Sequence, residues 1–195
     1  MKTYAKLEAG ALRMMGRVPN ISNPTEAQVA EHAAAHGFKE LVAVEQPGRY
    51  YRKGYAEGDT AITETWVPWE LDAAKADALR ELQGRRDAAM NGVVIPCEGL
   101  PNGILYNTEA QTMAQGLMLT AMQGGDITEE AWTDAADVEH AMSADLLANI
   151  AAAMREHIRT TQAKYKPARD AVNAAEDVDE VDAALQLISR LLAAD

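Results

Sequence analysis

Cysteine is almost missing from this sequence of 195 residues, in which Cys97 is the single example. One cysteine excludes an internal disulfide framework, so the fold needs no oxidising environment and depends on its core. Long apolar runs are missing too, because no stretch approaches the roughly 20 residues of a membrane-spanning helix. The first ten residues contain no apolar signal segment. We therefore expect a protein that folds in a cytoplasm and does not contact a membrane.

Basic side chains are scarce relative to acidic ones. The chain has 18 Lys and Arg against 30 Asp and Glu, which gives a formal net charge of -12. Such a surface repels phosphate backbones and anionic lipid head groups, so nucleic acid is not an expected partner. Hydrophobic residues make up 48% of the chain, enough to build the core of one ordinary domain or of two small ones.

Signatures of catalysis are also missing. None of the three serines lies in a G-x-S-x-G elbow, and one of them, Ser143, is placed to cap a helix. Cys97 follows Pro96 and lacks the local surroundings of known cysteine nucleophiles. Gly124-Gly125 has neither the lysine nor the strand-to-helix context of a phosphate-binding loop. The sequence therefore predicts a protein that is not an enzyme and uses no cofactor.

Two patterns suggest metal ligands and fail on spacing. His32 and His36 lie four residues apart on a predicted helix, but two imidazoles without a further ligand do not make a zinc site. The acidic run that starts at Glu176 lacks the glycine of a calcium loop, and Val181 occupies a position that needs an oxygen ligand. Acidic residues at a helix N-terminus explain this run without a cation. We expect no bound metal.

Turn and cap residues divide the chain near Trp69. Before it we expect strands over 4–8 and 11–15, a helix from Pro24 to His36 with a Thr25/Gln28 capping box, and strands over 41–45 and 60–67. The segment between the last two strands is interpreted as a loop. These features indicate a small β-rich module over residues 1–68.

After Trp69 the chain is alanine-rich and follows a helical period. The expected elements are a helix that begins near Leu71, a hairpin over 92–106 that turns at Pro101-Asn102-Gly103, a helix over 108–123 and two further helices. Those two begin at Ser143 and Asp177, and Pro167 should bend or end the first of them. The predicted fold is therefore α+β: the β-rich module followed by a mainly helical domain over residues 69–195 that contains one short β-hairpin.

One stretch stands out in a protein with only 5% aromatic residues: Arg49-Tyr50-Tyr51-Arg52-Lys53-Gly54-Tyr55. Tyrosine and arginine are the residue types that most often anchor interfaces. The alternative is that these tyrosines cover the small sheet together with the nearby tryptophans. Both interpretations stay open, and the first predicts the following partner-binding residues: Arg49, Tyr50, Tyr51, Arg52, Tyr55 and Trp69.

The carboxy-terminal segment alternates apolar residues at spacings of three and four. The pattern comprises Ala171, Ala174, Val178, Val181, Leu185, Ile188 and Leu192. This period favours helix-on-helix packing in a left-handed seam, which could join copies of the chain into a homo-oligomer. If Asp177 breaks the helix, as its capping pattern indicates, the seam packs on the domain's own helices instead.

Motifs from about Arg85 to Leu185 resemble a known family. They comprise Arg86-Asp87, Gly92-Val93, Gly103-Ile104-x-Tyr106-Asn107-Thr108, Trp132, Met154 and His157. Together they are similar to a domain of unknown function that is encoded in the tail-fibre gene region of bacteriophages and prophages. The amino-terminal stretch looks like short leader modules of gut-phage proteins through the segments Tyr4-Ala5-Lys6-Leu7, Asn23-Pro24-Thr25 and Gly58-Asp59-Thr60-Ala61-Ile62-Thr63-Glu64-Thr65-Trp66.

The resemblance implies a non-enzymatic tail-associated protein, either a structural component or a tail-fibre assembly factor. Its partners would be other phage tail or tail-fibre proteins, and by analogy with tail appendages an oligomer would be a trimer. The protein would be found in the host cytoplasm during assembly, and in the virion tail if it is retained there. The alternatives are an adhesin whose tyrosine-rich segment stacks on surface glycans, and a small hydrolase.

Overall fold

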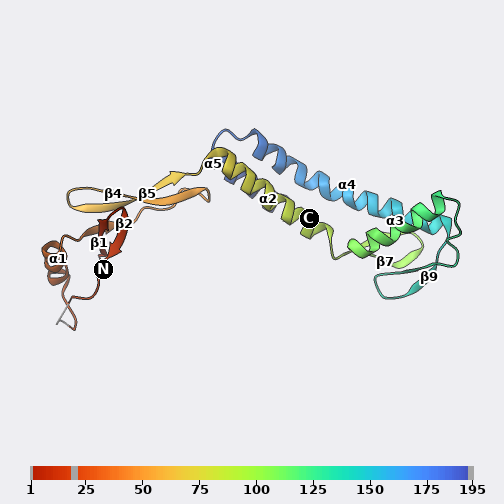
Figure 1. The fold of residues 1–195 in the computed structure, drawn as a ribbon, viewed down its shortest axis with the longest axis horizontal. Helices are drawn as coiled ribbons and strands as arrows, with labels where there is room; N and C mark the ends of the chain where they lie inside the picture. Colours follow the sequence, from red (N-terminus) through yellow and green to blue (C-terminus); the bar gives the residue numbers. More distant parts are fainter. Residues whose placement is uncertain (1, 19–21, 193–195) are drawn as a thin grey trace. The chain divides into compact units, whose positions relative to one another are not determined.

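The computed structural model of the chain describes residues 2–18 and 22–192, without the side chains of residues 191 and 192. Contacts between residues divide the chain into two units, residues 1–71 and 72–195. Strands predominate in the first unit and helices in the second (Figure 1). The chain is therefore a mixed α and β protein with amino-terminal strands and carboxy-terminal helices, as the sequence predicts.

In its described residues, unit 1 forms a five-stranded sheet with one helix. The sheet order is β2-β1-β3-β5-β4, and every neighbouring pair is antiparallel except the parallel pair β3–β5. The elements are β1 (Tyr4–Glu8), β2 (Ala11–Met14), α1 (Glu26–Ala35), β3 (Lys39–Val42), β4 (Tyr51–Glu57) and β5 (Ala61–Pro68). The predicted capping box is present: Thr25 accepts a hydrogen bond from the backbone N–H of Gln28, whose side chain accepts one from the backbone of Thr25. The predicted first pair of strands is confirmed as well.

Strand β4 corrects the interpretation of the tyrosine-rich segment as a loop. Residues 51–57 pair with β5 along their whole length, from Tyr51 opposite Pro68 to Glu57 opposite Ile62. Gly54 and the charged residues around it have weak intrinsic strand preference, so the sequence pattern does not predict a strand here. Pairing with the well-patterned β5 decides its conformation.

Unit 2 contains four helices and two two-stranded sheets within its described residues. Its elements are α2 (Leu71–Met90, which starts at the last residue of unit 1), β6 (Val93–Cys97), β7 (Leu100–Tyr106), α3 (Thr108–Met122), β8 (Ala131–Thr133), β9 (Glu139–Ala141), α4 (Ala144–Ala174) and α5 (Val178–Leu192). The predicted caps are confirmed: Asn107 and Ser143 accept hydrogen bonds from the backbone N–H groups of Ala110 and Leu146. The expectation of a single hairpin is wrong, because β8 and β9 form a second antiparallel pair.

The β6–β7 hairpin turns at a different place from the one predicted. Its two-residue turn is Glu98-Gly99, and Gly99 has a φ of 86°. The register shifts after Ile95, so that residues 101–103 form an irregularity within β7. Gly103 has a φ of 72°, and a Cβ atom there would lie 2.5 Å from the carbonyl oxygen of Ile95. Asn102-Gly103 is therefore a turn-like sequence used to shift the register of a strand.

Helix α4 has 31 residues and continues through Pro167, so of the two predicted effects of Pro167, a bend or an end of the helix, the end is wrong. Proline removes one backbone hydrogen bond and normally destabilises a helix interior. Tyr165, Ala168 and Val172 are buried around it. Packing of this face offsets the loss of the bond.

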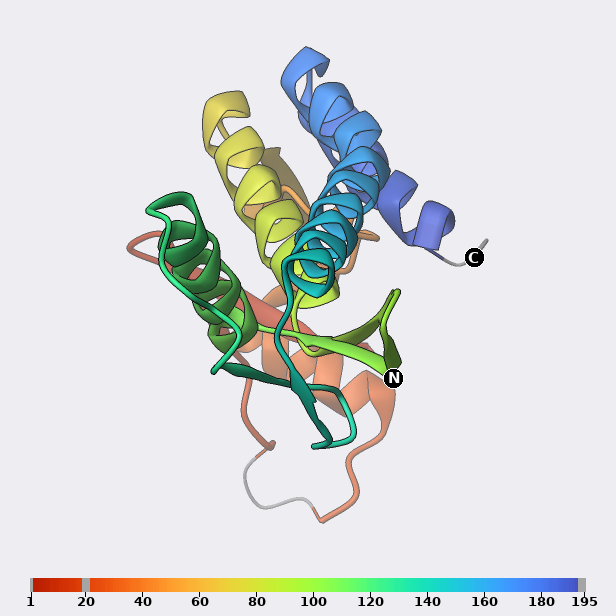
Figure 2. The same ribbon diagram turned by 90° about the vertical axis from the view of Figure 1, so that its right-hand side faces the viewer.

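The two halves of α4 pack against different parts of unit 2. Its amino-terminal half carries Leu147, Ile150 and Met154 into a cluster with the β6–β7 hairpin, α3 and Trp132. The carboxy-terminal half of α4 packs on α5. It also forms hydrogen bonds with α2, and α2 lies beside α4 (Figures 1 and 2). Contacts run from Met90 with His157 to Lys75 with Asn173, so α2 and α4 are antiparallel.

Asp177 separates α4 from α5, as the capping pattern predicts. Its carboxylate accepts a hydrogen bond from the backbone N–H of Glu180, and the Glu180 side chain accepts one from the N–H of Glu176. The apolar seam then packs on α4 within a single chain. The seam residues buried there are Val178, Val181, Leu185 and Ile188. The side chain of Leu192, which belongs to the same predicted pattern, lies outside the described part of the chain.

Candidate functional site

The tyrosine-rich segment separates into a buried residue and exposed neighbours. Tyr50 is only 1% exposed, and its ring packs edge-on against Trp69, with the ring centroids 5.6 Å apart. The guanidinium of Arg49 lies 5.5 Å from the centre of the Tyr50 ring. Tyr50 is therefore a core aromatic, the alternative that the sequence left open. Arg49 and the 39%-exposed Trp69 cover it at the surface.

Strand pairing brings several of the remaining aromatic residues to one face of β4–β5. Lys53 is opposite Trp66 and Tyr55 is opposite Glu64, and side chains of directly paired residues lie on the same face. Tyr51 shares this face, because it lies two residues before Lys53. We call these five residues the aromatic strand face: Tyr51, Lys53, Tyr55, Glu64 and Trp66. Arg52, also predicted as a partner contact, points to the opposite face, where it is paired with Val67.

A charge pair orders the aromatic strand face. The ammonium of Lys53 donates a hydrogen bond of 2.8 Å to Glu64 and lies 5.2 Å from the centre of the Trp66 ring. The Trp66 indole N–H donates to the carbonyl of Val44 at 3.0 Å. The hydrogen bond from Lys53 holds the pKa of Glu64 below its usual range, so the carboxylate stays ionised although it is almost buried. Trp66, missed as a candidate, is thus held in one orientation.

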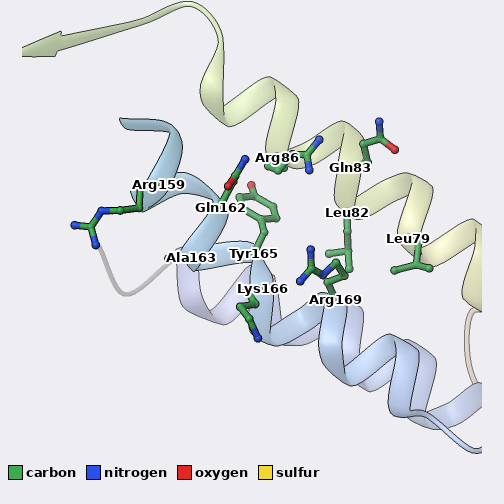
Figure 3. A pocket seen from close by; sticks show the side chains of 10 residues that line it. All are labelled: Leu79, Leu82, Gln83, Arg86, Arg159, Gln162, Ala163, Tyr165, Lys166 and Arg169. Carbon is green, nitrogen blue, oxygen red and sulfur yellow. The ribbon is translucent and has the colours of Figure 1, made fainter. Parts of the chain in front are cut away.

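A second candidate site lies in unit 2, between α2 and α4 (Figure 3). It is a cavity of about 530 Å³ whose apolar part is formed by Leu79, Leu82 and Tyr165. Leu82 and Tyr165 are buried, and the Tyr165 hydroxyl donates a hydrogen bond of 3.1 Å to the carbonyl of Arg85 on α2. We call this cavity the helix groove.

The polar lining of the helix groove is cationic. It consists of Arg86 and Gln83 from α2 and of Arg159, Gln162, Lys166 and Arg169 from α4. Among the described residues that line the groove, none is acidic. In Figure 3, Gln162 extends toward α2, Arg169 rises toward Leu82, and Arg159 and Lys166 point away from α2. A protein of net charge -12 thus gathers four cations along one groove.

Sequence reasoning missed the helix groove for two reasons. Its two walls lie about 75 residues apart along the chain, so no local motif joins them. The α4 wall nevertheless has a signal, because Arg159, Gln162, Lys166 and Arg169 recur at spacings of three and four, on one helix face. Pro167, which the sequence predicts to bend or end the helix, separates Arg169 from the other three residues.

A buried polar network lies beside β8–β9. The fully buried Asp134 carboxylate accepts hydrogen bonds from Asn102, from the backbone N–H groups of Ala136 and Val138, and from His140, whose Nε2 lies 2.9 Å away. Burial alone would raise the pKa of Asp134, but these donors outweigh it and hold the pKa well below its usual range. The contacts with Ala136, Val138 and His140 hold the β8–β9 turn together, and the contact with Asn102 ties it to β7, which indicates a structural role.

The remaining sequence candidates lie apart from one another. The ring centroids of His32 and His36 lie 4.4 Å apart near the end of α1, with the ring planes tilted by 53°, and His36 is the C-cap residue. Within residues 2–18 and 22–192, no three His, Cys, Asp or Glu side chains gather closely enough to hold a metal ion. Burial and the neighbouring Glu98 raise the pKa of the Cys97 thiol, which lowers its thiolate content.

Most residues that carry the family resemblance are internal to unit 2. Trp132 and Met154 belong to the core cluster. Tyr106 is buried, and its ring packs edge-on against His157, which contacts the carbonyl of Met90. Arg86 pairs with Asp87. These motifs therefore specify the fold of the unit, and of the residues named here only Arg86 also lines the helix groove.

The fold and its two candidate surfaces define a protein with an amino-terminal sheet unit and a carboxy-terminal helical unit. The chain belongs to the family described as Domain of unknown function (DUF4376), which matches residues 73–185, and this range lies within unit 2. No curated protein and no solved structure matches the chain. None of the helices in the described part combines the length and the apolar character that crossing a membrane requires.

Proposed function

We propose that this protein is a non-enzymatic, tail-associated protein of a bacteriophage or prophage that acts by binding other tail or tail-fibre proteins. It would serve as a structural component or as a tail-fibre assembly factor. The assignment to a tail rests on the motifs between Arg85 and Leu185 that resemble the tail-fibre-region domain. In this proposal the protein acts in the host cytoplasm during assembly, and in the virion tail if it is retained.

The observation that supports a binding role is the aromatic strand face. Tyr51, Tyr55 and Trp66 are half-buried, so part of each side chain is accessible to a partner. Rigid aromatic side chains lose little conformational entropy on binding and often anchor interfaces. The Lys53–Glu64 pair fixes charges beside them, which would orient a protein partner.

Co-purification tests this proposal. The full chain is co-expressed with the product of the adjacent tail-fibre gene, and capture is compared for the Tyr51→Ser/Tyr55→Ser variant and the Val67→Ser variant. Val67 lies on the opposite face of the same sheet and is 45% exposed, so it is a matched control. We expect capture to be lost only in the tyrosine variant, with the fold intact in both. Equal capture by both variants removes this face from the proposal, and a gene position within a metabolic operon removes the tail assignment.

A homo-oligomer is a separate part of the proposal. Trimers are natural for tail appendages, and the C-terminal helix is the segment proposed to join them. The apolar side of α5 already packs on α4 in the single chain, so an oligomer that keeps this fold has to use another side of α5. Light scattering of the full chain, and of a chain without residues 177–195, tests this. If the oligomer keeps its number of subunits after the deletion, α5 is not the segment that joins the copies.

Specific observations bear on the two alternatives. For a glycan-binding adhesin, the accessible tyrosines favour stacking on sugars, but the Lys53 ammonium lies over the Trp66 ring. For a small hydrolase, Asp134 and His140 form an acid–base pair. Ser143, three residues after His140, already accepts a hydrogen bond as the cap of α4. A glycan array and an ester-hydrolysis assay with His140→Ala test these alternatives.

A further inference from the structure

We infer that the helix groove between α2 and α4 is a binding site for an acidic, amphipathic segment of a partner protein. This inference goes beyond the proposed function, because it depends neither on unit 1 nor on the assignment to a phage tail. Three properties of the groove carry it: its apolar floor, its cationic rim and its length.

The floor and the rim of the groove call for different chemistry on one ligand. The half-buried Leu79, beside the buried Leu82 and Tyr165, offers apolar surface, which favours apolar side chains. The rim offers the guanidinium groups of Arg86 from α2 and Arg169 from α4, together with the amides of Gln83 and Gln162. Neither of these glutamine side chains forms a hydrogen bond within the described part of the chain. A ligand that satisfies both parts has an apolar side and a carboxylate side.

The arginines of the rim are pre-oriented by their own carboxylate partners. Arg86 uses Nε and Nη2 to bind Asp87, and Arg159 uses the same two atoms to bind Glu156. In both, Nη1 makes no hydrogen bond to any described residue. Lys166 and Arg169 share Asp170. Exposed pairs of this kind contribute little stability themselves, yet they hold the guanidinium planes and leave donors for a further carboxylate.

The length of the groove matches a short helix. From Arg159 to Arg169 the α4 wall spans ten residues, or about 15 Å, which is roughly three helical turns. Helices that lie in a groove between two helices place apolar residues at spacings of three and four along one side. The same spacing puts carboxylates along the flanks, within reach of cations on either wall.

Charge and shape favour a protein segment over a nucleic acid. The net charge of -12 repels a long phosphate backbone, whereas a short acidic helix meets only the local field of the groove. Single-stranded nucleic acids also need exposed rings for base stacking, and the one aromatic residue in the lining, Tyr165, is 5% exposed.

Fluorescence polarisation with synthetic probes tests the inference on the full chain. The probe is a labelled amphipathic peptide of about four helical turns, with leucines on one side and glutamates on the other. A peptide with glutamine in place of each glutamate and a labelled oligothymidine serve as comparison probes. We expect the glutamate peptide to bind more tightly than either, and to weaken as ionic strength rises.

Charge reversal locates the site. Arg86→Glu/Arg169→Glu should weaken binding of the glutamate peptide by at least about tenfold, the factor that corresponds to 1.4 kcal/mol. The control is Arg80→Glu/Arg155→Glu, which makes the same charge change on the same two helices outside the lining. If the reversed variant fails to fold by circular dichroism, the neutral variant Arg86→Gln/Arg169→Gln replaces it, with a smaller loss expected.

Each contrary outcome overturns the inference. Equal losses in the groove and control variants mean that overall charge, rather than the groove, attracts the peptide. Equal binding of the glutamate and glutamine peptides means that carboxylates are not recognised. Tighter binding of the oligothymidine than of the glutamate peptide assigns the groove to nucleic acid instead. These readouts use no tail protein, so they succeed or fail independently of the proposed function.

Discussion

Replacing Tyr50 by serine should unfold much of unit 1, whereas the same change at Tyr55 should not. Tyr50 is 1% exposed and packs edge-on against Trp69. Truncating a buried aromatic side chain typically costs about 3–5 kcal/mol. For a folded unit of 71 residues, stability of about 0.05–0.15 kcal/mol per residue gives about 4–11 kcal/mol in total. The Tyr50 ring therefore accounts for about a quarter of this stability or more, while replacing the half-buried Tyr55 should cost under about 1 kcal/mol.

Peptide-resolved hydrogen exchange measures this in the intact chain. Peptides from β4 and β5 of the Tyr50→Ser variant should lose protection, while peptides from α4 serve as an internal reference in unit 2. A shift of about 4–8 °C per kcal/mol predicts that unit 1 of this variant melts more than about 12 °C below the unchanged chain. Unchanged protection of β4 in Tyr50→Ser, or an equal loss in Tyr55→Ser, would falsify the assignment of Tyr50 to the core.

Three further predictions concern unit 2. In urea titrations, Gly103→Ala should destabilise unit 2 by at least about 2 kcal/mol more than Gly92→Ala. Both glycines have positive φ, but only at Gly103 would a Cβ atom press against Ile95. Equal losses of stability in the two variants would contradict this. The Asp134 carboxylate has a lowered pKa, so the stability it contributes is complete above its unfolded pKa of about 3.9 and is lost as pH falls toward the folded value. Urea midpoints measured between about pH 5 and pH 2 should therefore fall less steeply for Asp134→Asn than for the unchanged chain, and parallel curves would refute this. Ser143→Ala should lower the unfolding free energy by about 1 kcal/mol, because α4 loses its cap, and Ser143→Asp should retain most of the stability; calorimetry measures both. An alanine variant as stable as the unchanged chain would show that the cap does not stabilise α4.

Local chemistry predicted the elements whose ends are capped. Thr25 with Gln28, Asn107 and Ser143 each satisfy the first N–H groups of a helix, and the structure has helices beginning at these places. The break at Asp177 was predictable for the same reason. Such signals lie within four residues of one another, so a single sequence contains them completely.

The features that the sequence did not reveal depend on distant partners. Strand β4 is decided by its pairing with β5, and the continuation of α4 through Pro167 by the packing around Tyr165 and Val172. Strands β8 and β9 have three residues each, too few to show an alternating pattern. The helix groove needs Arg86 on α2 and Arg169 on α4 to line one cavity, an arrangement that tertiary packing alone creates.

The antiparallel contact between α2 and α4 joins two helices that leave the ribosome at different times. The Tyr165 hydroxyl binds the carbonyl of Arg85 across 80 residues of chain, and Lys75 reaches Asn173 across 98. At roughly 5–20 residues per second, α2 leaves the ribosome about 4 to 16 seconds before the part of α4 that covers it. Ala74, Ala78 and Leu82, which are buried in the finished unit, are therefore synthesised before α4 is complete. Unit 1 can complete its sheet in the same interval, because all its strands precede residue 69.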